Sequence, residues 1–186
     1  MKAFKEVNLA KSIGAIIIFS IFSFGFTNAS QNQNAEIKMS NTILRFIPTA
    51  PDFIPSKYNQ DKAKEYLETI LKSTKVKFTQ TEKVEFVDQG SSFESVACNV
   101  CGKSISNDAW QREMDNAYRK HFADLTFITP CCHKQTTLND LNYNAPAGFA
   151  KFIIEIPDPS GDIEPNEITE LEKLLGTKVR KIWAHY

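Results

Sequence analysis

The chain has no excess of charge of either sign. Its 22 lysine and arginine residues match 22 aspartate and glutamate residues across 186 positions, so the formal net charge is zero. Proteins that bind nucleic acid or anionic membranes through their overall electrostatic field carry a basic excess. The balance of charges therefore argues against nucleic acid as a partner, and against membrane binding outside the N-terminal segment.

The familiar catalytic signatures are also missing. The sequence contains no nucleophile elbow, P-loop, dinucleotide-binding fingerprint or HExxH motif. Hydrophobic residues make up 42% of the chain, which is typical of a globular protein and too high for a disordered one. The sequence therefore indicates a folded domain, but it leaves open whether that domain is an enzyme.

Cysteine is absent from the first half of the chain, and all four cysteines lie between positions 98 and 132. The first pair forms a Cys98-x-x-Cys101 motif that is followed by Gly102. This spacing allows two thiolates to reach one metal ion from a single tight turn. A glycine directly after the second cysteine suits a turn that needs an unusual backbone angle.

The second pair of cysteines is adjacent in sequence and is followed by His133. Neighbouring residues can bind one ion only where the backbone bends between them, and Pro130 favours such a turn. Zinc prefers four nitrogen or sulfur ligands in a tetrahedron. In an alternative ligand set His133 replaces one cysteine, and His121 is a weaker substitute. The preferred set for a structural zinc ion is Cys98, Cys101, Cys131 and Cys132.

Two other uses of the cysteines remain open. Four cysteines in an exported protein could form two disulfides. A C-x-x-C motif can also be a redox pair, but thioredoxin-type motifs lie at the start of a helix after a strand. Here Gly102 and a polar stretch separate the motif from the next apolar helix. We therefore prefer zinc over disulfides, and disulfides over redox chemistry.

The N-terminal segment 1–38 decides the expected compartment. Lysines precede the apolar run Ile13 to Phe26, and Thr27-Asn28-Ala29 offers a small-residue cleavage site, as in a secretory signal peptide. The run is shorter than the roughly 20 residues that span a bilayer, which disfavours an uncleaved anchor. Met39 is an alternative start, which would make segment 1–38 an over-extended reading frame. The first two interpretations predict an exported, periplasmic or anchored protein, and the third predicts a cytoplasmic one.

The remainder, residues 39–186, shows the alternating signals of an α+β domain. Apolar residues at helical spacing alternate with short β-branched or aromatic runs. Helices are expected over 61–72, 109–120 and 164–175. Strands are expected over 42–47, 75–79, 83–87, 124–128, 149–156 and 179–186, and residues 139–148 are expected to form a loop.

An internal echo suggests how these elements are arranged. Phe46-Ile47-Pro48 and Ile154-Glu155-Ile156-Pro157 each precede a proline-containing loop, a leucine-rich helix and a Thr-Lys-Val strand start. Two such units predict a β-α-β-β-α-β order, in which an antiparallel sheet carries two helices on one face. Residues 93–138 would then form an inserted zinc-ribbon-like subdomain. The alternative is an α+β domain without internal symmetry.

Several short strings are spread over roughly residues 40 to 186. They are Arg45-Phe46-Ile47-Pro48-Thr49, the CxxCG and Pro130-Cys131-Cys132 motifs, Leu138-Asn139-Asp140-Leu141 with Tyr143, Pro146-Ala147-Gly148-Phe149-Ala150, and Trp183-Ala184-His185-Tyr186. Together they resemble a group of small bacterial proteins that share a zinc-ribbon-like layout, and the resemblance implies no activity. Members of the group begin near the equivalent of Met39 and often carry glycine at the position of His133, which implies the four-cysteine ligand set.

A polar segment beside the second cysteine pair offers a second candidate site. Asn139, Asp140 and Tyr143, with His185 from the chain end, could line a pocket. We prefer an ordered loop, because Asn and Asp side chains readily bond to their own backbone. The sequence thus favours a small binding or interaction module with a structural zinc site and a protein or small-molecule partner. The alternatives are an enzyme that uses this pocket and an exported protein with disulfides.

Overall fold

The computed structural model describes residues 41–72 and 75–186. The expectations for residues 1–38 and for a start at Met39 lie outside the described residues. Within the described part, no helix is both long and apolar enough to cross a membrane.

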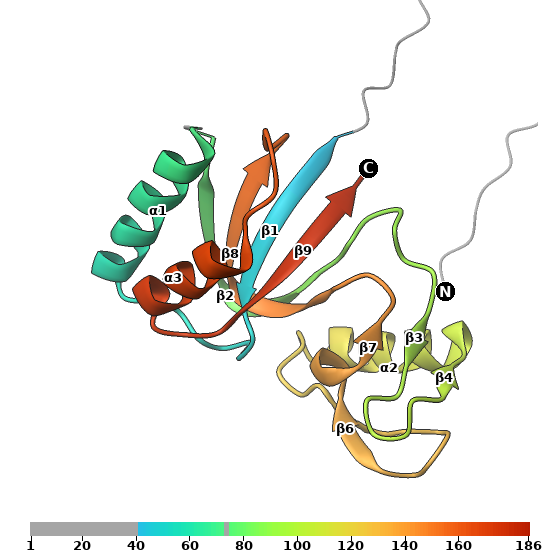
Figure 1. Cartoon of the computed structure of the whole chain (residues 1–186). Helices are drawn as coiled ribbons and strands as arrows, with labels where there is room; N and C mark the ends of the chain where they lie inside the picture. Colours follow the sequence, from blue (N-terminus) through green and yellow to red (C-terminus); the bar gives the residue numbers. More distant parts are fainter. Residues whose placement is uncertain (1–40, 73–74) are drawn as a thin grey trace, which may run out of the picture. The chain divides into compact units, whose positions relative to one another are not determined.

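A four-stranded antiparallel sheet forms the centre of the fold (Figure 1). Its central strands are β1 (Thr42–Pro48) and β8 (Gly148–Pro157), and its edges are β2 (Lys77–Val87) and β9 (Val179–His185), in the order β2-β8-β1-β9. Proline ends both central strands, since it cannot donate a ladder hydrogen bond. The predicted α+β class is confirmed.

Helices α1 (Lys57–Leu71) and α3 (Pro165–Leu175) cover one face of this sheet (Figure 1). The side chain of Ser56 caps α1, and Glu164 forms a capping box with Glu167 at the start of α3. The apolar stripes of both helices meet the sheet in one core. Its fully buried members include Leu67, Leu171, Leu175, Phe46, Phe152 and Ile154.

The order of these elements matches the internal echo in the sequence. Outside the segment between β2 and β8, the chain runs β1-α1-β2 and then β8-α3-β9. The expectation of two separate strands over 75–79 and 83–87 was wrong, because residues 77–87 form the single strand β2. The pairing of β2 with β8 shifts register between Gln80 and Glu85. The polar residues at this irregularity interrupt the strand pattern in the sequence, which is why one strand was predicted as two.

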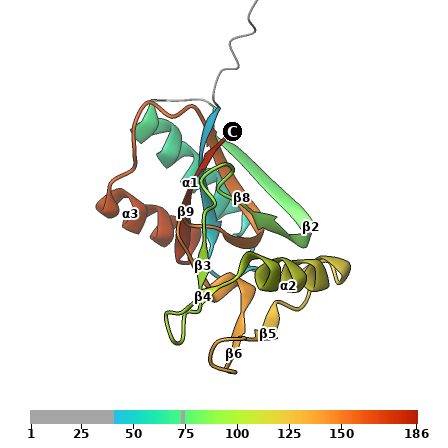
Figure 2. The ribbon, with the colours of Figure 1, turned by 90° about the vertical axis from the view of Figure 1, so that its right-hand side faces the viewer.

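The segment between β2 and β8, residues 88–147, forms a smaller cysteine-bearing region (Figure 2). It is longer than the expected insertion 93–138. A hydrophobic cluster around Met114, Phe127 and Leu138 fills it, and Phe149 of β8 joins the same cluster. Its elements are β3 (Val96–Ala97), β4 (Ser104–Ile105), α2 (Asn107–Arg119), β5 (Thr126–Ile128), β6 (Gln135–Thr137), the 3-10 helix η1 (Leu138–Asp140) and β7 (Asn142–Tyr143).

The expected loop 139–148 is therefore partly ordered into regular structure. It contains the end of η1, and β7 pairs with β3 through Val96 and Tyr143. This pairing joins residues far apart in the sequence, so the local pattern of Asn and Asp residues could not indicate it.

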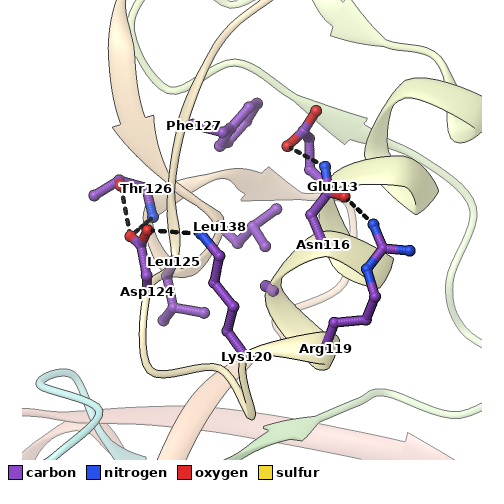
Figure 3. A pocket seen from close by; sticks show the side chains of 10 residues that line it. Glu113, Asn116, Arg119, Lys120, Asp124, Leu125, Thr126, Phe127 and Leu138 are labelled. Atoms are coloured by element: carbon purple, nitrogen blue, oxygen red, sulfur yellow. Dashed lines mark hydrogen bonds and ion pairs between the residues drawn. The ribbon is translucent and has the colours of Figure 1, made fainter.

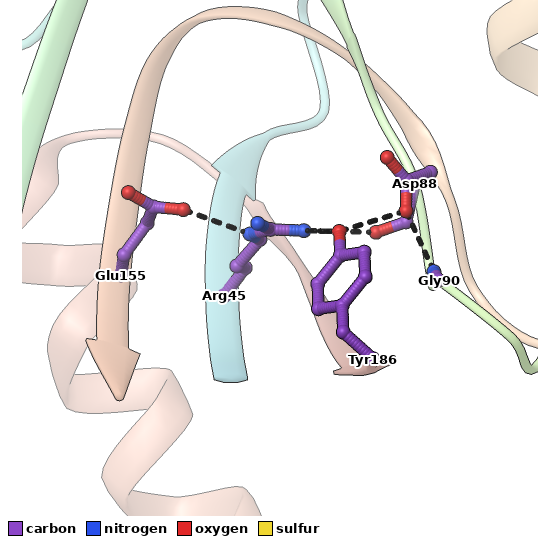
Figure 4. A network of polar contacts seen from close by, with 5 residues as sticks. All are labelled: Arg45, Asp88, Gly90, Glu155 and Tyr186. Carbon is purple, nitrogen blue, oxygen red and sulfur yellow. Dashed lines mark hydrogen bonds and ion pairs between the residues drawn. The ribbon is translucent and has the colours of Figure 1, made fainter. Parts of the chain in front are cut away.

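The face of the sheet that the helices leave uncovered carries a polar network (Figure 4). Arg45 Nε donates to Glu155 Oε1 at 3.0 Å, and Arg45 Nη1 donates to the hydroxyl of Tyr186 at 2.9 Å. That hydroxyl donates to Asp88 Oδ1 at 2.9 Å. Burial lowers the pKa of Arg45, but these hydrogen bonds outweigh it and raise the pKa above its ordinary value. Arg45 and Glu155 thus form an ion pair, and the carboxylate of Asp88 accepts from the Tyr186 hydroxyl and from the N–H of Gly90.

Candidate metal centre

The first cysteine pair lies at the turn of the hairpin formed by β3 and β4. The N–H of Cys98 donates to the carbonyl of Lys103, and the N–H of Gly102 donates back to the carbonyl of Cys98, both at 2.9 Å. The N–H of Val100 donates to the Cys98 sulfur at 3.3 Å. Gly102 has φ of 73°, a left-handed conformation that glycine adopts without strain. The predicted role of this glycine is confirmed.

The second cysteine pair lies at the turn of the hairpin formed by β5 and β6. The N–H of Thr129 donates to the carbonyl of Lys134, and the N–H of His133 donates to the carbonyl of Thr129, both at 2.9 Å. His133 has φ of 56°. The two turns therefore share one hydrogen-bond pattern, in which His133 occupies the place of Gly102.

This correspondence explains why the second pair lacks a C-x-x-C spacing. Thr129 lies at the position that corresponds to Cys98, so the second turn has no sulfur atom there. Cys131 supplies this sulfur ligand instead, from the position that corresponds to the exposed Val100. Thr129 is fully buried, and its hydroxyl lies 3.2 Å from the sulfur of Cys132. Sequence reasoning missed Thr129, because only the hairpin register aligns it with the first turn.

The two turns bring all four sulfur atoms together. The Sγ atoms of Cys98 and Cys132 are 3.8 Å apart, and those of Cys101 and Cys131 are 3.3 Å apart. All four sulfur atoms lie within 4.8 Å of one another. A tetrahedral zinc ion with Zn–S bonds of about 2.3 Å has sulfur–sulfur edges of about 3.8 Å. The four cysteines therefore lie close enough to bind one metal ion.

The four thiols have unequal surroundings. Cys98 is fully buried, whereas Cys101 is exposed. Burial raises the pKa of Cys98, but the N–H groups of Cys101 and Val100 and the neighbouring thiols donate to its sulfur and lower the pKa to about 6. Burial and the adjacent sulfurs raise the pKa of Cys131 to about 12. Hydrogen bonds thus already stabilise negative charge on one sulfur of the cluster.

The alternative ligands and chemistries fit this geometry less well. The group of mutually close ligand atoms contains neither His133 nor His121. The four cysteines are free, and their closest sulfur separation of 3.3 Å exceeds the roughly 2.05 Å of a disulfide bond. The C-x-x-C motif lies in a β-hairpin rather than at a helix start, unlike a thioredoxin-type redox pair.

The structure does not bring the whole second candidate set, Asn139, Asp140, Tyr143 and His185, together in one pocket. The side chain of Asn139 is buried and bonds to the carbonyl of Thr49 and to the N–H of Phe149. The hydroxyl of Tyr143 donates to the carbonyl of Leu138 at 2.9 Å, and burial raises the pKa of Tyr143 to about 12. These bonds support the ordered-loop interpretation. A cavity of about 340 Å³ nevertheless lies beside this segment, but His185 does not line it. The lining residues are Asp140, Leu141, Asn142, Tyr143, Pro146, Ala147 and Arg180.

Another cavity, of about 300 Å³, lies between α2 and β5 (Figure 3). The charged side chains at its rim bond to other side chains of the same rim. Lys120 pairs with Asp124 at 3.4 Å, and Arg119 donates to Asn116, which in turn donates to Glu113. These side chains satisfy one another and do not converge on a common point in the cavity.

Comparison of the chain with protein-family models, curated proteins and solved structures finds no match. The function must therefore be argued from the geometry of the sites themselves.

Proposed function

We propose that the protein is a small binding module whose cysteine-bearing region is held together by one structural zinc ion. The observation that carries the proposal is the convergence of four sulfur atoms within 4.8 Å of one another from two hairpin turns. Sulfur ligands of this number and spacing suit zinc in a closed tetrahedral site. The two hairpins and α2 would then form a zinc-ribbon-like subdomain.

The hairpins are too short to be stable without additional support, which a bound metal ion would supply. The strands β3 and β4 have 2 residues each, and β5 and β6 have 3 each. Isolated hairpins are only marginally stable in water. A structural zinc ion contributes roughly 10 kcal/mol to folding in small metal-dependent domains. We expect bound metal to fix the hairpin turns and, through them, the neighbouring segment 138–147.

The closed ligand set supports a structural rather than a catalytic metal. A catalytic zinc ion keeps one coordination position for water or substrate, whereas four thiolates occupy every position of a tetrahedron. The alternative enzyme would use the Asp140 cavity instead. Because most polar groups of Asn139 and Tyr143 are bonded within the fold, we prefer a binding role for that cavity.

Metal analysis of the purified protein with matched variants tests the proposal. Cys98→Ser removes a fully buried sulfur, and Val100→Ser changes an exposed residue of the same turn without removing one. We expect about one equivalent of zinc in the parent and in Val100→Ser, and a joint loss of zinc and thermal stability in Cys98→Ser. Cobalt substitution should give the charge-transfer and d–d bands of a tetrahedral thiolate site.

Two outcomes would overturn the proposal. Protein that contains no metal but keeps full thermal stability would exclude a structural ion. An intact mass that increases on reduction would instead show disulfides, for which Cys98–Cys132 and Cys101–Cys131 are the nearest sulfur pairs.

The same mass measurement, made on protein from its native host, addresses the compartment. Free thiolates persist best in reducing compartments. Bound zinc is therefore most compatible with a chain that starts at Met39 and remains in the cytoplasm. A mass that starts directly after Ala29 would instead identify a cleaved export signal.

A further inference from the structure

Arg180 on β9 holds the segment before β8 against the sheet. It lies opposite Ile47 in the sheet and is half-buried. Its Nη1 donates to Asn139 Oδ1 at 3.2 Å and to the carbonyl of Ala147 at 2.5 Å, and its Nη2 donates to the carbonyl of Asn139 at 2.9 Å. All three acceptors are neutral oxygens.

Among the described residues, these three bonds leave two donors of the guanidinium group without a partner. The group has five N–H bonds, two on each terminal nitrogen and one on Nε. The contacts of Nη1 use both of its hydrogens, and those of Nη2 use one. The remaining donors are Nε–H and one Nη2–H. Nε and Nη2 can together present the parallel pair of N–H bonds that binds both oxygens of a carboxylate or phosphate.

The charge of Arg180 also lacks an acidic partner. Among residues 41–72 and 75–186, no carboxylate forms a salt bridge with it, whereas Arg45 on the same sheet face has Glu155. Burial lowers the pKa of Arg180, and the opposing charge interactions with Tyr143 and Asp140 do not offset this effect. A half-buried cation bonded only to carbonyl oxygens is poorly compensated, and an oxyanion would compensate it.

Arg180 lines the cavity of about 340 Å³ that also contains Asp140 and Tyr143. Gly148 makes room for the guanidinium group, because a Cβ at this position would lie 2.4 Å from Arg180 Nη1. Asp140 is exposed, and its Oδ2 accepts a hydrogen bond from Thr137 at 2.6 Å. No group of residues 41–72 or 75–186 donates to Oδ1 of Asp140, so this oxygen can accept from a ligand.

We propose that this cavity binds a small amphoteric carboxylate, such as an α-amino acid, with its carboxylate on the Nε–Nη2 edge of Arg180 and its ammonium group near Asp140. One fixed cation and one fixed anion in the same cavity match a ligand of zero net charge. The same anion disfavours phosphate, which carries more negative charge than a carboxylate. The ligand class goes beyond the proposed metal role and does not depend on it.

An NMR titration of the full-length, metal-analysed protein with L-alanine, acetate, ethylamine and inorganic phosphate tests this proposal. We expect L-alanine to shift the resonances of the cavity residues and to bind about tenfold more tightly than acetate or ethylamine, as the gain of one charge-assisted contact implies. Phosphate should bind more weakly than L-alanine. Tighter phosphate binding would overturn the assignment to a carboxylate.

Three variants separate the contributions of the two charges. Asp140→Asn retains an oxygen for Thr137 and should weaken L-alanine binding about tenfold while leaving acetate binding unchanged or improved. Asp115→Asn changes an exposed carboxylate on α2 and should change nothing. Arg180→Lys keeps the charge but removes the paired donors, so it should weaken both L-alanine and acetate.

Because Arg180 also ties the loop to the sheet, Arg180→Lys alone could act through folding, and Asp140→Asn provides the decisive comparison. Equal affinities of this variant for L-alanine and acetate support the proposal, and unchanged discrimination overturns it. A parent protein whose cavity resonances respond to none of the four probes also overturns it. Zinc content measured on each sample separates this failure from loss of the metal.

Discussion

Replacement of His133 by glycine should stabilise the protein and leave the metal content unchanged. His133 is exposed and has φ of 56°, which costs a residue with a side chain roughly 1–2 kcal/mol relative to a right-handed conformation. Glycine avoids this cost but gives the unfolded chain about 0.4–1 kcal/mol more conformational entropy. The net gain in the free energy of unfolding should be about 0.5–1 kcal/mol, or roughly 1–4 °C in Tm.

Gly102→Ala is the matched reverse change in the first turn. Gly102 has φ of 73°, and a Cβ there would meet nothing within 4 Å, so only the backbone conformation is tested. The variant should lose about 0.5–1 kcal/mol by the same reasoning. Denaturant unfolding of the zinc-loaded parent and both variants, with metal analysis of each, measures the effects.

Loss of zinc in His133→Gly would refute the reasoning directly, because it would identify His133 as a ligand. Lower stability with zinc retained would show that the histidine side chain makes a contact that outweighs its backbone cost. The equivalence of the two turns predicts effects of opposite sign and similar size.

Two further predictions concern other parts of the fold. Both polar side-chain atoms of the fully buried Gln89 lack a hydrogen-bond partner among the described residues. Gln89→Met should therefore raise the free energy of unfolding by about 1–2 kcal/mol, measured by denaturant unfolding. A lower free energy of unfolding in the variant would show that the Gln89 side chain is hydrogen-bonded in solution. Burial raises the pKa of Glu172, but Lys178 and the N–H of Val179 outweigh this and lower it. The stability from Glu172 is therefore present above its unfolded pKa of about 4.3 and is lost as the pH falls through the lower folded pKa. Glu172→Gln should reduce Tm at pH 7 and make the fall of Tm in acid shallower, and an unchanged acid profile would contradict the assignment.

Much of the fold could be predicted because local patterns carried it. Leucines at helical spacing and good capping residues mark α1 and α3, since a helix buries one stripe of side chains. The apolar strands closed by proline mark β1 and β8. The echo between the two halves even indicated the element order, which the structure confirms.

The grouping of the cysteines was equally accessible to sequence reasoning, whereas the reason for their spacing was not. Two cysteine pairs on turns predict convergence on one ion, because a tetrahedral metal needs four ligands. Only the register of β5 with β6 shows that Thr129 stands where Cys98 stands in the first turn, and that His133 stands where Gly102 does.

The amino-acid sequence by itself determined the helices, the main strands and the clustering of sulfur ligands, because each depends on neighbours within a few residues or on spacing along the chain. The tertiary structure alone decided that Asn139 and Tyr143 are bonded within the fold, and that Arg180 joins Asp140 in one cavity. These contacts link residues of separate elements, and the packing of those elements decides which polar groups find a partner inside the protein and which are left for a ligand.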